Sequence, residues 1–136
     1  MKIGIVGSRR RNTKEDQQMI FDLVQQKIET EGQRLMLISG GCPEGADSFA
    51  EKAADYFGVS MLVHYPVKIP KATSKQEATD RFYARNRKIA MDCDILYAMI
   101  SPDRTGGSEN TIKYALSFGK TVVLIFPDGS HHEWTN

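Results

Sequence analysis

Glycine residues gather in three short stretches of this chain, and each stretch directly follows an apolar run. The stretches read GSRR from residue 7, GGCPEGAD from residue 40 and TGGSEN from residue 105. Because glycine has no side chain, the backbone N–H groups of such turns can approach an anion closely, and a helix that follows adds the partial positive charge of its N-terminus. We interpret the three stretches as turns that bind an anion together. Their glycines are Gly7, Gly40, Gly41, Gly45, Gly106 and Gly107.

Arginine residues are concentrated in the first glycine turn, the third predicted helix and the last glycine turn, whereas the lysines are spread along the chain. Arginine grips phosphate or carboxylate in a bidentate fork, so this distribution indicates an anion site. Arg85 lies about 12 Å along a predicted helix from the start of the next strand, and Arg81 shares its helix face. For Arg10, Arg11 and Arg87 the favoured alternative is a solvated basic face. Seven of the eight arginines belong to this group: Arg9, Arg10, Arg11, Arg81, Arg85, Arg87 and Arg104.

Short apolar runs must position these residues. They cover residues 2–6, 35–39, 60–63, 95–99 and 121–125 and are apolar almost throughout, as expected of strands in a parallel sheet that is covered on both faces. Helices are predicted over residues 14–31, 47–57, 74–93 and 109–118, the first with a capping box formed by Thr13 and Asp16. We therefore predict an α/β fold, a Rossmann-like three-layer αβα sandwich with a mainly parallel sheet of about five strands.

The predicted fold brings the three glycine stretches together. Each stretch follows a predicted strand, and the carboxyl ends of parallel strands share one edge of the sheet, where ligands bind. We expect a joint anion site at this edge. Tyr65, Phe82 and Tyr83 are candidates for stacking on a base, with core packing the favoured role of Phe82.

Size and charge set the class of protein. The length suits one domain, which we place at residues 1–136, with a core over 1–126 and a polar C-terminal tail over 127–136. Residues 64–75 form a long connection and a candidate lid. The net charge of +1 gives no overall attraction to nucleic acid or membrane, and no apolar run suits a signal peptide or a membrane span. We expect a cytoplasmic protein that does not bind membranes.

Several known site motifs are missing from the sequence. GxGxxG does not follow the first strand, the second strand ends without an acidic ribose ligand, and GxxxxGK[ST], HExxH and GxSxG are absent. Cys42 and Cys93 lie far apart, and His131 and His132 are adjacent in the tail, so neither pair predicts a metal site. We expect no cofactor and no metal.

Four segments of the chain resemble, in order and spacing, the SLOG superfamily of Rossmann-like proteins, which includes DprA and the LOG phosphoribohydrolases. They read GIVGSRR, SGGCPEGADSFAEKA, RNRKIAMDCD and GGSENTIKYALSFGKTVVLI, and the resemblance spans residues 1–125. The first three segments look most like DprA. The chain resembles a small stand-alone member of the superfamily.

The resemblance implies a nucleotide or nucleotide-derived ligand at the carboxyl edge of the sheet. Residues 106–111 would hold its phosphate, with Ser8 and Arg9 on a second part of the ligand and Asp47 with the second glycine turn on a third. Asp47 is also the predicted N-cap of the second helix, which we favour. The expected ligand-binding residues are Gly7, Ser8, Arg9, Gly40, Gly41, Gly45, Asp47, Arg81, Arg85, Gly106, Gly107, Ser108, Asn110 and Thr111.

Catalysis is the least defined expectation. In LOG enzymes an arginine and a glutamate act on the ribose and its N-glycosidic bond. Arg85 matches the arginine, but the position of the glutamate holds Lys113, and Glu109-Asn110 replaces a Gly-Thr pair. Arg85 and Glu109 are therefore the candidate catalytic residues, and the favoured alternative for Glu109 is an acidic residue that complements a helix N-terminus.

Three functions follow. The first is a sensor or sequestering protein for a nucleotide or nucleotide-derived small molecule. The second is a nucleotide N-glycosidic hydrolase, and the third is a binder of single-stranded DNA that uses residues 9–11 and 85–87 as a backbone track. The relatives commonly form oligomers, so a homo-oligomer is expected.

Overall fold

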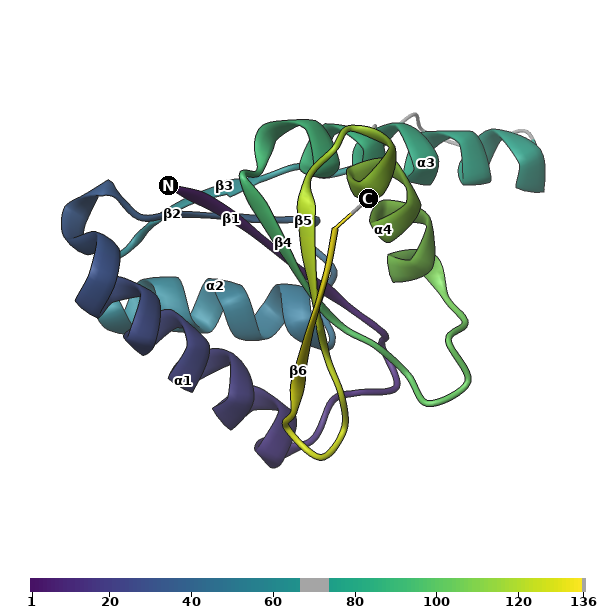
Figure 1. The fold of residues 1–136 in the computed structure, drawn as a ribbon. Helices are drawn as coiled ribbons and strands as arrows, with labels where there is room; N and C mark the ends of the chain where they lie inside the picture. The colour runs from purple at the N-terminus through teal and green to yellow at the C-terminus, as the bar shows by residue number, and fades with distance from the viewer. Residues whose placement is uncertain (67–73, 136) are drawn as a thin grey trace.

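A twisted sheet forms the middle layer of the protein (Figure 1). In a computed structural model, which describes residues 1–66 and 74–135, the sheet has six strands in the order β3-β2-β1-β4-β5-β6. Every neighbouring pair is parallel except β5 and β6, which are antiparallel. The strands are β1 (Lys2–Gly7), β2 (Met36–Ser39), β3 (Ser60–Val63), β4 (Ile95–Met99), β5 (Thr121–Ile125) and β6 (His131–Trp134).

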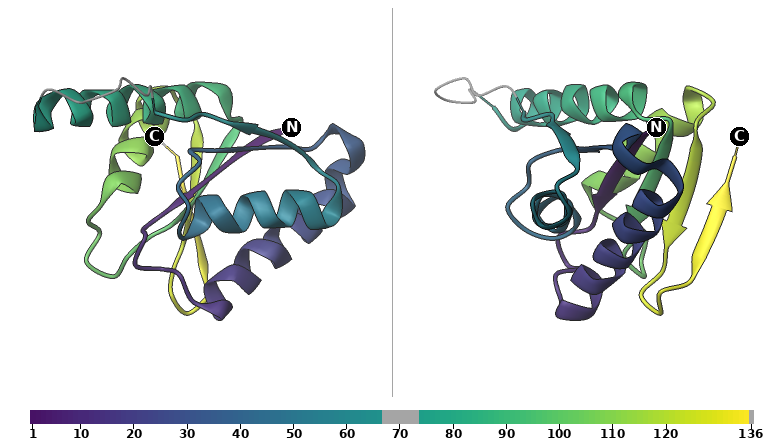
Figure 2. Two further views of the ribbon diagram at one scale, coloured as in Figure 1. Left: turned by 180° about the vertical axis from the view of Figure 1, so that it is seen from behind. Right: turned by 90° about the vertical axis from the view of Figure 1, so that its left-hand side faces the viewer.

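Helices cover both faces of this sheet (Figure 2). On one face, α1 (Lys14–Glu31) and α2 (Ala46–Phe57) pack over one apolar cluster. On the other face, α3 (Lys75–Asp92) and α4 (Gly107–Ser117) pack over a second apolar cluster. A short 3₁₀ helix, Gly32–Arg34, joins α1 to β2. None of the helices described in residues 1–66 and 74–135 is long and apolar enough to cross a membrane.

Alternate residues of each central strand enter opposite clusters. In β1, Ile3 and Ile5 belong to the cluster under α1 and α2, whereas Val6 belongs to the cluster under α3 and α4. Burying one such side chain contributes about 1.5–3 kcal/mol. Since both faces are covered, the strands are apolar without alternation, and the predicted fold class is confirmed.

The sheet has one strand more than predicted. β6 lies within the predicted tail and pairs antiparallel with β5, with His132 opposite Leu124. All four of its residues, HHEW, are exposed, so an apolar pattern could not reveal it. The candidate lid over residues 64–75 includes residues 67–73, which lie outside the described residues.

The strand order creates a crevice between β1 and β4. From β1 the chain winds outward to β2 and β3, and from β4 it winds the other way to β5 and β6. The helices after β1 and β4 therefore lie on opposite faces, and the turns that lead to them separate at the carboxyl ends of these strands. Such a switch point is where open α/β sheets bind ligands.

Candidate functional site

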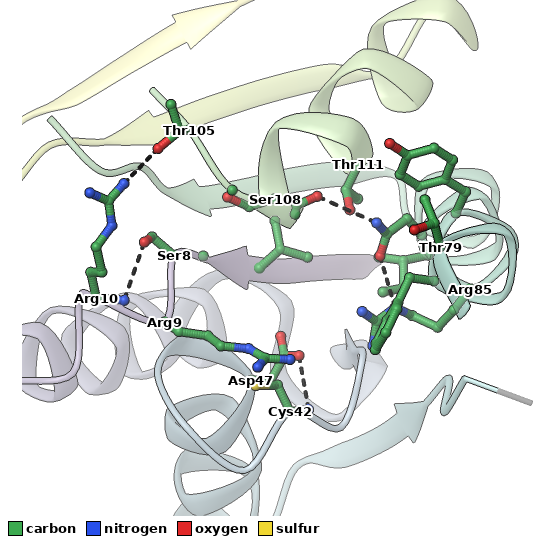
Figure 3. A pocket seen from close by; sticks show the side chains of 18 residues that line it. Ser8, Arg9, Arg10, Cys42, Asp47, Thr79, Arg85, Thr105, Ser108 and Thr111 are labelled. Atoms are coloured by element: carbon green, nitrogen blue, oxygen red, sulfur yellow. Dashed lines mark hydrogen bonds between the residues drawn. The ribbon is translucent and has the colours of Figure 1, made fainter. Parts of the chain in front are cut away.

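A cavity of about 460 Å³ opens at the carboxyl ends of β1 and β4 (Figure 3). Its volume falls within the range of about 300–1,000 Å³ that is typical of ligand pockets. The turns after β1, β2 and β4 and one side of α3 form its walls, and apolar side chains of Val6 and Ile89 contribute to its lining. The cavity therefore lies at the switch point of the sheet.

The structure brings many of the expected residues to this cavity, but not all. Those that line it are Gly7, Ser8, Arg9, Asp47, Arg85, Gly106, Gly107, Ser108 and Thr111. Those that lie outside its lining are Gly40, Gly41, Gly45, Arg81, Asn110 and Glu109. The second glycine turn therefore contributes less to the cavity surface than its composition suggested.

Close packing explains two of the glycines. A Cβ atom at Gly7 would lie 2.9 Å from the Cβ atoms of both Ala46 and Met99, so glycine lets the start of α2 approach β1 and β4. A Cβ atom at Gly40 would overlap the guanidinium of Arg85. Instead, the carbonyl of Gly40 accepts a hydrogen bond of 2.5 Å from Nη1 of Arg85. The absence of a side chain at Gly40 thus leaves room for the guanidinium of Arg85, and the Gly40 residue itself does not line the cavity.

The N-terminus of α4 forms one wall. Its first turns contribute Gly107, Ser108 and Thr111 to the lining, after Gly106 as the N-cap. The first amides of a helix have no partner within the helix, and they lie at its positive end. Ser108 is only 7% exposed, yet its hydroxyl has no hydrogen-bond partner among residues 1–66 and 74–135. A buried hydroxyl beside free amides is an arrangement suited to an anion.

Asp47 forms part of the opposite wall, and its predicted role as an N-cap is wrong. The N-cap of α2 is Gly45, with a φ of 74°, and Asp47 lies in the first turn of the helix. Oδ2 of Asp47 accepts a hydrogen bond of 3.0 Å from the amide of Cys42, which fixes the turn after β2. Burial raises the pKa of this carboxyl, while the Cys42 amide and the charge of Arg85 act in the opposite direction. In Figure 3 the other carboxylate oxygen points toward the cavity.

Arg85 and Asn86 connect α3 to both glycine-rich walls. Nε of Arg85 donates a hydrogen bond of 2.8 Å to Oδ1 of Asn86. Asn86 is 4% exposed and donates in turn to Oδ1 of Asn110 over 3.1 Å and to the carbonyl of Gly107 over 3.4 Å. Burial lowers the pKa of the Arg85 guanidinium. Asn110 therefore supports the wall from behind.

The other arginines differ widely in their surroundings. Arg9 lines the cavity and makes no hydrogen bond or ion pair with any described residue. Arg10 also reaches the lining but is held by Asp103, with N–O distances of 2.9 and 2.5 Å, and by Thr105 at 2.7 Å. Arg81 pairs with Glu77 at 2.5 Å, and both lie outside the lining.

Arg11 is a structural residue, not a solvated one. It is 4% exposed, and its guanidinium pairs with Asp16 at 3.0 Å. It also donates to the carbonyls that end β4 and β5, those of Ile100, Ile125 and Phe126. Since Arg11 is buried, it cannot form part of a continuous basic track over residues 9–11.

The candidate catalytic carboxylate is also occupied. Glu109 accepts two hydrogen bonds from Arg104, at 3.0 and 2.8 Å, in the first turn of α4. Lys113, which stands at the position of the LOG glutamate, is exposed and outside the cavity lining. The two positions on α4 that the hydrolase alternative considers therefore lie away from the cavity surface.

The sequence interpretation missed several lining residues. Asn86 lies in the RNR segment and was given no role, although a polar residue at helical spacing from the apolar Phe82 and Ile89 was a usable signal in the sequence. Phe82 is 40% exposed and lines the cavity, so its expected core packing is wrong. Cys42, which belongs to the second glycine stretch, and Thr79 also line the cavity, and neither was among the expected ligand-binding residues.

Comparison with known proteins shows similarity to solved structures. No protein-family model matches the chain, and no curated protein matches it. Among solved structures, DNA processing protein A (DprA) from Streptococcus pneumoniae is similar at a TM-score of 0.69 and 23% identity, over 90% of this chain and 49% of that one. The molybdenum cofactor carrier protein MCP from Chlamydomonas reinhardtii is similar at a TM-score of 0.66 and 27% identity, over 90% of this chain and 74% of that one.

These similarities confirm the resemblance at the level of fold. The chain has a DprA/SLOG-like fold, because both solved structures have folds of the SLOG type. It spans about half the length of the DprA chain, at 49%.

Proposed function

We propose that the protein binds a nucleotide or a nucleotide-derived small molecule in the cavity at the switch point, as a sensor or sequestering protein. The observation that carries this proposal is the buried, unpartnered hydroxyl of Ser108 beside the first amides of α4. A phosphate group supplies acceptor oxygens that satisfy both kinds of donor at once.

The charges around the cavity support a phosphorylated ligand. Arg9 is unpaired within the described residues, whereas Arg10 is already neutralised by Asp103. Within the described residues Arg9 is thus available to meet an anion, and Arg85 adds a second positive charge at the cavity that has no ion-pair partner. A guanidinium that has no protein partner breaks no protein contact when it turns to a phosphate.

Aromatic side chains on α3 support a nucleoside portion. Phe82 and Tyr83 are 40% and 44% exposed, and both line the cavity. Stacking a base on an aromatic ring contributes about 1–3 kcal/mol and tolerates different bases. A phosphate at α4 and a base at α3 would leave the sugar over the floor between them.

Binding without hydrolysis is the form that we favour. Glu109 is engaged by Arg104, and the position of the LOG glutamate holds a lysine, Lys113, so neither position on α4 gives the cavity lining a free carboxylate. The similarity to MCP, a molybdenum cofactor carrier, also favours a role in holding a small molecule.

Binding of single-stranded DNA is the second candidate, because the DNA-processing protein DprA has the same fold. Burial of Arg11 and the pairing of Arg10 with Asp103 leave Arg9 alone in the first segment of the expected track. This arrangement favours a compact ligand over an extended backbone.

A thermal-shift panel tests the proposal. Nucleoside mono- and diphosphates, cyclic nucleotides, dinucleotides, ADP-ribose and a single-stranded oligonucleotide are each added to the purified protein. A ligand at 100 times its Kd stabilises the fold by about 2.7 kcal/mol, which raises the melting temperature measurably. With Arg9→Ala, about ten times more ligand should be needed for the same rise in melting temperature, because the variant removes one charge-assisted contact. Arg34→Ala, an exposed arginine far from the cavity, serves as the control. The proposal would be overturned if none of these compounds raised the melting temperature.

A further inference from the structure

We propose that the carboxylate of Asp47 accepts hydrogen bonds from the sugar hydroxyls of the ligand, so that the cavity prefers ribonucleotides to 2′-deoxyribonucleotides. The inference rests on the proposed function and specifies the class of nucleotide.

The two oxygens of Asp47 have different surroundings. Oδ2 accepts the amide hydrogen of Cys42 at 3.0 Å, so the turn after β2 holds the side chain in place. The other oxygen points toward the cavity (Figure 3). Asp47 is only 9% exposed, and it lines the cavity. A buried carboxylate has acceptor capacity for about four hydrogen bonds and is costly when that capacity is unused.

The nearest cation does not saturate this carboxylate. Arg85 acts on Asp47 through its charge, but the two form no ion pair within 4.0 Å in the described structure. Its Nη1 and Nε atoms are directed to the carbonyl of Gly40 and to Asn86. Arg85 is therefore held beside Asp47 without an ion pair, and the backbone of Gly40 acts on the same carboxylate together with the Cys42 amide. Among residues 1–66 and 74–135 no side chain donates a hydrogen bond to Asp47, so the sugar hydroxyls of a ligand can supply donors for the oxygen that faces the cavity.

The position of Asp47 points to sugar hydroxyls as those donors. A phosphate is repelled by the carboxylate and has its own place at Ser108 and α4, on the facing wall. The base has the aromatic side chains of α3, which share a helix face with Thr79. In a nucleoside 5′-phosphate the sugar stands between these two groups. Its hydroxyls are then the donors that can face a carboxylate on the remaining wall.

A comparable arrangement is known from doubly wound folds, in which an acidic residue after the second strand binds the ribose 2′-hydroxyl. The sequence shows no acidic residue directly after β2, where Ser39 is followed by Gly40 and Gly41. Asp47 follows only after the glycine turn, in the first turn of α2, but the turn folds back so that its carboxylate binds the amide of Cys42. The chain thus supplies the carboxylate from a different position.

Matched pairs of nucleotides test the inference. The affinities of the four ribonucleoside 5′-monophosphates and of their 2′-deoxy counterparts are measured by isothermal titration calorimetry. We expect each ribonucleotide to bind about 10- to 100-fold more tightly than its deoxy counterpart, because loss of the hydroxyl leaves a charged acceptor unpaired. Since the comparison is made on the unaltered protein, it does not depend on the folding of a variant.

A variant assigns the preference to one residue. Asp47→Asn keeps an oxygen for the Cys42 amide but loses the charge, and we expect the ribose-to-deoxyribose ratio to fall below about 3-fold. Glu44→Gln removes an exposed carboxylate from the same turn and should leave the ratio unchanged. An unchanged ratio in Asp47→Asn would overturn the assignment.

The remaining outcomes separate this inference from the proposed function. Equal binding of ribo- and deoxyribonucleotides by the unaltered protein would overturn the role of Asp47 and leave nucleotide binding intact. Absence of binding by every monophosphate of either sugar would also overturn the inference, whereas the proposed function is rejected only if the other compounds of the thermal-shift panel fail as well.

Discussion

Arg85 donates the hydrogen of Nε to Oδ1 of its own neighbour, Asn86, over 2.8 Å. Adjacent residues on a helix normally point in different directions, so this contact fixes the guanidinium in one orientation. The same Asn86 side chain holds Asn110 on α4 at 3.1 Å. Two walls of the cavity are therefore connected through one buried amide.

Asn86→Ala should disrupt both walls. Without the amide, Nε of Arg85 and the side chain of Asn110 each lose a partner, and we expect a loss of about 1–3 kcal/mol in the free energy of unfolding. Ligand binding should weaken as well, because Arg85 is no longer oriented. Urea denaturation measures the change in stability, and calorimetric titration measures the change in affinity.

Asn12→Ala is a useful comparison. It also removes a hydrogen bond, the one that Asn12 accepts from the amide of Gly45, but Asn12 lies outside the cavity lining. Wild-type affinity in Asn86→Ala would contradict the role of this residue.

Two consecutive arginines should differ sharply in their effect on stability. Arg11→Met leaves Asp16 as an unpaired buried charge, and the carbonyls at the ends of β4 and β5 lose their hydrogen-bond donor. We therefore expect the free energy of unfolding to fall by about 3–5 kcal/mol. Arg10→Met breaks an exposed pair with Asp103 that solvent screens, so the free energy of unfolding should stay close to that of the unaltered protein. Urea unfolding of the two variants side by side tests this. Equal losses would show that Arg11 is not the buried residue described above.

Gly7→Ala and Gly107→Ala should differ in their effect on stability, because only Gly7 is closely packed. An added methyl group at Gly7 meets Ala46 and Met99 at 2.9 Å, and we expect a loss of about 1–3 kcal/mol in stability. At Gly107 an added Cβ meets nothing within 4 Å, so the stability should change by less than about 0.5 kcal/mol. Thermal denaturation of both variants provides the measurement. A stable Gly7→Ala variant would mean that β1, β4 and α2 can move apart at this point.

The two cysteines should react at very different rates with iodoacetamide. Cys93 is buried, and burial raises the pKa of its thiol to about 11, so almost no thiolate is present at pH 8. Cys42 is partly exposed in the cavity wall. We expect Cys42 alone to be alkylated in the folded protein, and more slowly once a cavity ligand is bound. Peptide mass spectrometry identifies the labelled residue. Rapid labelling of Cys93 would show that the sheet face under α3 opens readily.

Periodic features of the sequence predicted the fold well. The strands Ser60–Val63, Ile95–Met99 and Thr121–Ile125 begin and end where their apolar runs do, because both faces of the sheet are covered. Thr13 and Asp16 form the expected capping box at the start of α1. β6 escaped prediction because an exposed edge strand needs no apolar residues.

The candidate site was harder to predict, because its residues depend on contacts between distant segments. Glycine marked the right turns, but Gly7 and Gly40 are explained by close approach to Ala46 and Arg85, which sequence cannot show. Arginine clustering predicted roles for Arg9 and Arg85, yet it could not distinguish them from Arg11, whose partners lie on α1 and at the ends of β4 and β5. Residue type indicated the chemistry, and only the fold determined which side chains were free to perform it.

The cavity draws its walls from segments that extend from Val6 to Thr111. A nascent chain on the ribosome therefore has no place for the ligand until α4 has been synthesised and has packed against α3. If the proposed nucleotide binds here, it cannot guide the early steps of folding and stabilises only the finished domain. Cellular abundance of the protein should then follow the supply of its ligand, since occupied molecules are withdrawn from the pool that proteases can degrade.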